Sequence, residues 1–94
     1  MAKRIPDFNW GVWEGVLWLE DLDAGSISLT NGMEAALDSL RAEFDFEPGA
    51  KFVYRDSEGV WDGVVVDSVD PILVTFFGIG ASTRDSAIAH LSHE

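Results

Sequence analysis

The fold is decided between residues 51 and 91, which have the sequence KFVYRDSEGVWDGVVVDSVDPILVTFFGIGASTRDSAIAHL. The first five residues alternate, with Phe52 and Tyr54 on one face and Val53 between two basic residues on the other, as in a half-buried strand. Turn-forming Asp, Ser, Gly and Pro residues then separate two further runs rich in β-branched and aromatic residues. The pattern predicts three strands, with a β-bulge at Asp62-Gly63 in the second. They span residues 51–55, 60–66 and 72–77.

A helix is predicted after the third strand. Gly78-Ile-Gly80 provides the backbone freedom to leave the sheet, and Ser82 or Thr83 can cap the first N–H groups of a helix. Asp85 would lie near the positive end of that helix. These features predict a helix over residues 83–92.

A second helix is predicted upstream of the strands. Asn31 can cap it, and Glu34 can close a capping box. Apolar residues at helical spacing then form one face that could cover a sheet. The predicted helix covers residues 32–44, and its apolar face comprises Met33, Ala36, Leu37, Leu40 and Phe44.

Residues 7–23 contain three of the four tryptophans and allow two interpretations. A helix capped by Asn9 would place Trp10 and Trp13 on one stripe. A hairpin would instead pair residues 15–20 with residues 26–29. We favour the hairpin, because Gly11 and Gly15 would each cost a helix about 1 kcal/mol.

Residues 1–94 are therefore predicted to form a single α+β domain, with 1–6 as a flexible arm. The predicted order is helix, three-stranded antiparallel sheet, C-terminal helix (α-β-β-β-α), preceded by a tryptophan-rich hairpin or helix. No apolar run has the length of a membrane span, and no signal-peptide pattern is present, so we expect a soluble, cytoplasmic protein with no membrane contact. The chain has no cysteine, which excludes disulfides and thiolate chemistry.

Charge is the most informative feature of the composition. Seventeen acidic residues face six Lys and Arg, and the formal net charge is −11. Binding to DNA or RNA requires basic residues that displace counterions from phosphates, so direct nucleic-acid binding is not expected. The same charge favours a basic partner, or serves solubility alone. No combination of residues predicts a catalytic, cofactor-binding or metal site, and we predict that the protein is not an enzyme.

The helix-strand-strand-strand-helix order of residues 31–94 resembles the double-stranded-RNA-binding domain. The likeness is strongest over residues 78–91, where that family has a Gly-x-Gly corner, a Ser, a lysine pair and an alanine-rich helix. Thr83 and Arg84 stand in place of the lysines that grip phosphates, so the resemblance implies the fold without the RNA contact. The matching residues are Gly78, Gly80, Ser82, Ala87, Ala89 and Leu91.

Residues 28–34 and 54–62 are similar to segments of small accessory proteins of bacteriophages and prophages. This resemblance covers about half of the chain and includes no catalytic motif. It implies a role in the contest between phage and host, where short acidic proteins such as anti-CRISPR proteins block a host machine. The end of the chain is also similar to that of an antitoxin family with a related architecture.

These observations predict an acidic binding protein, of the kind that inhibits a host protein by occupying its basic, nucleic-acid-binding surface. Two alternatives stay open: an antitoxin or regulatory subunit that neutralises an enzyme, and a structural homo-oligomer such as a homodimer used in particle assembly. Acidic groups in predicted loops, with an aromatic anchor, are the candidate contacts. They are Glu43, Asp45 and Glu47; Asp56, Glu58 and Asp62; Glu20, Asp21 and Asp23; and the anchors Trp13 and Trp61.

Overall fold

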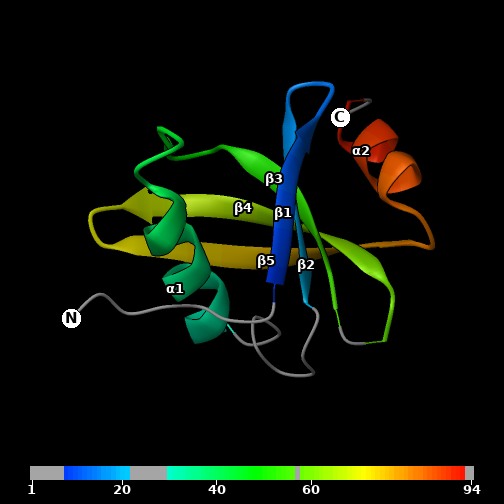
Figure 1. The fold of residues 1–94 in the computed structure, drawn as a ribbon, viewed down its shortest axis with the longest axis horizontal. Helices are drawn as coiled ribbons and strands as arrows, with labels where there is room; N and C mark the ends of the chain where they lie inside the picture. The colour runs from blue at the N-terminus through cyan, green and yellow to red at the C-terminus, as the bar shows by residue number, and fades with distance from the viewer. Residues whose placement is uncertain (1–7, 22–29, 57, 93–94) are drawn as a thin grey trace.

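The described residues of the protein form one five-stranded sheet with two helices (Figure 1). The computed structural model describes residues 8–21, 30–56 and 58–92. The strands are hydrogen-bonded in chain order, β1-β2-β3-β4-β5. The elements are β1 (Phe8–Trp13), β2 (Val16–Asp21), α1 (Thr30–Leu40), β3 (Lys51–Arg55), β4 (Trp61–Val69), β5 (Ile72–Ala81) and α2 (Arg84–Ser92).

The sheet is mixed. β1–β2, β3–β4 and β4–β5 pair antiparallel, whereas β2 and β3 pair parallel, with α1 in the connection between them. The predicted three-stranded antiparallel sheet is therefore wrong, because the N-terminal hairpin adds two strands to it. Figure 1 shows β1 and β2 crossing the direction of β4 and β5 steeply, since the twist accumulates from strand to strand.

The N-terminal hairpin turns at Glu14-Gly15. Both residues have positive φ, 51° and 81°, as a two-residue type I′ turn requires. Gly11 lies directly under the indole of Trp18, and a Cβ at this position would lie 2.6 Å from that ring. The described part of this segment, residues 8–21, thus forms a hairpin and not a helix, but its strands differ from the predicted pair. The predicted second strand, residues 26–29, lies outside the described residues.

Helix α1 ends at Leu40, four residues earlier than predicted. The amides of Glu43 and Phe44 both donate to the Leu40 carbonyl, and the chain then leaves the helix axis. Helix α1 begins at Thr30, so Asn31 lies inside the helix and is not its cap, and the Glu34 carboxylate accepts a hydrogen bond from the Val74 amide at 3.2 Å. Neither helix of the described residues is long and apolar enough to cross a membrane.

The C-terminal elements follow the prediction more closely. The bulge between Trp61 and Gly63 is confirmed, and a second register shift lies between Val66 and Ser68. Thr83 caps α2 by accepting from the Ser86 amide at 3.2 Å. The glycine corner is displaced, however: β5 continues through it to Ala81, with Gly80 at a φ of 70°.

Each helix covers one face of the sheet. The α1 face carries the larger core, and the α2 face carries a smaller one around Trp61, Ala87 and Ile88. Val53, which the predicted alternation places opposite Phe52 and Tyr54, is fully buried because α2 packs against it. The larger core comprises Leu17, Leu19, Met33, Ala36, Leu37, Leu40, Phe52, Tyr54, Val64, Val66, Ile72 and Val74.

Truncating Leu40 tests the position of α1. Leu40 is buried in the larger core, so Leu40→Ala should lower the free energy of unfolding by about 2–5 kcal/mol. Leu73→Ala is the matched control, because Leu73 is 46% exposed and its truncation should change stability by well under about 1 kcal/mol. Urea denaturation followed by tryptophan fluorescence measures both. Equal losses would show that α1 does not pack as described.

Candidate functional site

Residues 43–47, Glu-Phe-Asp-Phe-Glu, form an acidic strip along the outside of the domain. The three carboxylate residues are exposed and the two phenylalanines between them are partly buried, so the segment alternates as an extended strand does. Phe44 and Phe46 pack against the larger core and against each other, with ring centroids 6.0 Å apart. The rings fix the strip to the domain, and Glu43, Asp45 and Glu47 remain in solvent.

The acidic strip lies beside the first strand. Trp10 of β1 meets Phe44 edge to face, at a centroid distance of 5.2 Å. A groove of about 210 Å³ opens between the hairpin and the strip. We call it the aromatic groove. It is lined by Val12, Gly15, Leu17, Phe44, Asp45, Phe46, Ala50, Lys51 and Phe52.

Strand β1 also carries most of the exposed large apolar side chains. Trp10, Val12 and Trp13 are 41%, 50% and 43% exposed. Trp10 and Val12 lie on the α1 face of β1 beside the acidic strip, and Trp13 lies on the other face. Exposed apolar surface with a polar rim is typical of a protein contact. Of the predicted anchors, Trp13 is therefore at the surface, whereas Trp61 is buried in the smaller core and its ring is not available.

Trp13 is held in place by a cation–π stack. The guanidinium of Arg84 lies 5.0 Å from the Trp13 ring and 5.1 Å from the Trp18 ring. This contact joins the start of α2 to the hairpin and orients Trp13 without covering it. Its outer surface remains open to a partner.

The second predicted acidic group is mainly structural. One Asp56 oxygen accepts the amides of Glu58 and Val60 at 2.9 and 3.0 Å, which closes the β3–β4 turn. One Asp62 oxygen accepts the amides of Ile79 and Gly80, both at 3.0 Å, and so holds the bulged end of β5. Glu58 alone of the three is an exposed carboxylate without such a role.

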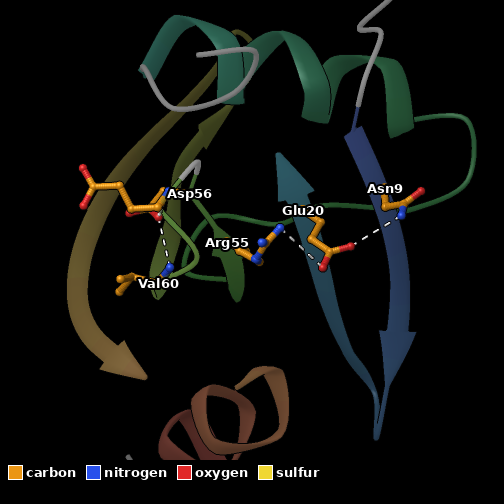
Figure 2. Close-up of polar contacts among 6 residues, drawn as sticks. Asn9, Glu20, Arg55, Asp56 and Val60 are labelled. Carbon is orange, nitrogen blue, oxygen red and sulfur yellow. Dashed lines mark hydrogen bonds and ion pairs between the residues drawn. The ribbon is translucent and has the colours of Figure 1, made fainter. Parts of the chain in front are cut away.

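Glu20 and Asp21, of the third predicted acidic group, also lie within the sheet. Glu20 accepts from Asn9 at 3.4 Å and pairs with Arg55 at 3.8 Å, so a polar row crosses three strands (Figure 2). Asp21 is buried, and Asp23 lies outside the described residues. Among the described residues of the three predicted groups, those of the acidic strip alone are all exposed and lie beside an apolar surface.

The basic residues of the described chain are already engaged. Arg41 pairs with Asp38 at 3.7 Å, Arg55 with Glu20, and Arg84 with Asp85 at 3.4 Å. Lys51 also has an interaction partner. Across residues 8–21, 30–56 and 58–92, the structure gives the three carboxylates of the acidic strip no ion pair, and no group of three His, Asp or Glu side chains could hold a metal ion.

Sequence reasoning missed Val12, Phe44 and Phe46 as parts of this surface. Phe44 had been assigned to the apolar face of the predicted helix, which concealed the alternation of acid and phenylalanine over residues 43–47. That period of two was visible in the sequence and would have predicted an extended segment. The contact between Trp10 and Phe44 could not be predicted from the sequence, because it depends on the hairpin joining the sheet.

Titration of the single tyrosine tests the acidic environment of the sheet. Burial, and then the carboxylates of Asp56, Asp62 and Asp21, raise the pKa of Tyr54 above its usual value of 10.0. The folded state thus holds the phenol proton more tightly than the unfolded chain does. This stabilisation is present below pH 10 and is lost as pH rises through the folded pKa. Phenolate absorbance measures the pKa and Tyr54→Phe is the control; a midpoint at or below 10 would contradict the placement.

Removing the Asp62 carboxylate tests its structural role. Asp62→Ala leaves two amides of β5 without their acceptor, so we expect a loss of about 1–3 kcal/mol in the free energy of unfolding. Asp70→Ala, at an exposed position in the β4–β5 turn, should change it by no more than about 0.5 kcal/mol. Chemical denaturation compares the two variants. Similar stabilities would show that Asp62 does not hold β5.

Comparisons with known proteins identify no relative of this chain. No protein-family model matches the chain, and neither a curated protein nor a solved structure shows significant similarity to it. The resemblances to the double-stranded-RNA-binding domain and to phage accessory proteins therefore remain predictions from sequence. The surface formed by the acidic strip, the aromatic groove and β1 is the candidate functional site.

Proposed function

We propose that the protein is an acidic binding module that occupies a basic surface of a partner protein through the acidic strip and the exposed residues of β1. The observation that carries this proposal is the position of Glu43, Asp45 and Glu47 immediately beside Trp10 and Val12, through the contact of Phe44 with Trp10. Carboxylates attract and orient a basic partner, while exposed aromatic and aliphatic side chains supply contact area that can be removed from water.

The partner proposed is a protein whose basic surface otherwise binds nucleic acid. The three carboxylate residues occupy alternate positions, 43, 45 and 47, and all three are exposed beside the partly buried phenylalanines. Lys and Arg side chains that receive phosphates form similar charge-assisted hydrogen bonds with carboxylates. A protein bound in this way excludes nucleic acid from the surface that it covers, which is the action of an inhibitor.

Charge reversal of the acidic strip tests the proposal. The variant Glu43→Lys, Asp45→Lys, Glu47→Lys changes the net charge by six units and should lose capture of basic proteins from nuclease-treated lysate. The control Asp38→Lys, Glu58→Lys, Asp70→Lys changes the net charge equally on other exposed positions. Its capture should persist, because the charges that contact the partner are intact. Quantitative mass spectrometry of the captured proteins compares the variants at low and high salt.

Two further results bear on the identity of the partner surface. Added duplex DNA or RNA should compete with the wild-type protein for the captured partner, since both would bind the same basic residues. Circular dichroism of both triple variants should match that of the wild type, because the six residues are exposed. Equal capture by the two variants would show that the acidic strip does not contact the partner and that the net charge serves solubility alone. Absence of competition would show that the partner surface covered by this protein does not bind nucleic acid.

A further inference from the structure

The free edge of β1 has backbone N–H and C=O groups that could pair with another strand. Among the described residues β1 pairs with β2 alone, so its other side carries backbone groups outside the sheet. Trp13 and Val16 flank the two-residue turn and form a hydrogen-bonded pair. Bonded and non-bonded pairs alternate in an antiparallel ladder, so the N–H and C=O groups of Trp10 and Val12 point away from β2.

The two edges of the sheet differ in how they are protected. At β5, the Glu34 carboxylate already accepts the Val74 amide, and two register shifts distort the pairing with β4. β1 contains neither Lys nor Pro and pairs with β2 through six consecutive residues without a shift. A regular edge strand with exposed apolar side chains is a site of association unless it is protected.

We infer that β1 takes a sixth strand, supplied by an extended, basic segment of the partner protein, an inference that rests on the proposed function. A strand paired with Trp10 and Val12 has the acidic strip on its α1 side and Glu14 beyond the end of β1. Its backbone completes the hydrogen bonds of the edge, as in β-strand addition. Its Lys or Arg side chains reach the strip, and its apolar side chains cover Trp10, Val12 and Trp13.

Charge selects this occupant over a second copy of the chain. Two copies paired through β1 would bring together two acidic strips, two Glu14 residues and two molecules of net charge −11. Like charges across an interface oppose association, whereas a basic strand removes the repulsion. The aromatic groove beside Val12 provides space for an apolar side chain of the added strand.

Selection from a displayed library of random peptides about nine residues long, with the wild-type protein as bait, provides the probe. Enriched peptides should contain Lys or Arg together with β-branched or aromatic residues. Synthetic copies N-methylated at single amides should lose at least about tenfold in affinity at alternate positions and little at the others, because only alternate amides of a strand face β1. N-methylation without an alternating effect would overturn strand addition.

A matched pair of substitutions tests the same edge from the protein side. Val12→Pro removes the outward N–H while leaving the β1–β2 bonds, since proline is tolerated where an edge N–H faces solvent. Val12→Ala retains that N–H and removes only side-chain area. Val12→Pro should weaken peptide binding at least about tenfold and more than Val12→Ala does. Should Val12→Pro fail to fold by circular dichroism, the N-methylated series on the wild type decides the question.

The acidic-strip variant separates this inference from the proposed function. If charge reversal at residues 43, 45 and 47 abolishes binding but N-methylation and Val12→Pro do not affect it, strand addition is wrong and the proposed function stands. If N-methylation and Val12→Pro abolish binding but charge reversal does not affect it, the proposed function is wrong and the added strand need not be basic. A wild-type dimer in sedimentation that Val12→Pro dissociates would replace the partner strand by a second copy.

Discussion

The architecture depends on the parallel pairing of β2 with β3. Three residue pairs, Trp18 with Val53, Leu19 with Tyr54 and Glu20 with Arg55, join the N-terminal hairpin to the β3–β4–β5 meander. A parallel pair cannot be closed by a tight turn, so the chain crosses over one face of the sheet, and α1 lies in that crossover. β3 becomes the central strand, and Phe52, Val53 and Tyr54 are buried from both sides.

The same pairing creates the candidate site. It places β1 at one edge of the sheet, two strands away from β3, while the chain returning from α1 to β3 must pass the hairpin. Because α1 ends at Leu40, residues 44–47 lie outside the helix, and Phe44 meets Trp10. Because phenylalanine and acid alternate over residues 43–47, the phenylalanines pack against the core and the carboxylates face solvent. In a longer α1, Glu43 and Glu47 would share one face of the helix and Asp45 would point to another.

The distribution of charge follows from the packing. Arg84 lies between Trp13 and Trp18, Arg55 completes the polar row with Glu20, and Arg41 pairs within the α1 region. Several carboxylates likewise serve the fold: Asp56 closes a turn, Asp62 holds β5, and Glu34 protects its edge. The other acidic residues find no free basic partner, because the basic residues that the structure describes are already engaged. The surplus negative charge is therefore presented to solvent, and three of these carboxylates, Glu43, Asp45 and Glu47, lie in the segment beside β1.

Local sequence patterns determined the α+β class, the three C-terminal strands, the bulge at Asp62-Gly63 and the helix capped by Thr83, because each depends on neighbouring residues. The tertiary structure alone decided the five-stranded mixed sheet, since the β2–β3 pairing joins residues far apart in the chain and Glu14-Gly15 is not a usual hairpin turn sequence. It also decided that Val53 and Trp61 are buried and that Asp62 is structural. Charge and aromatic content indicated a binding surface, but only packing brought the acidic strip, Trp10 and the open edge of β1 together.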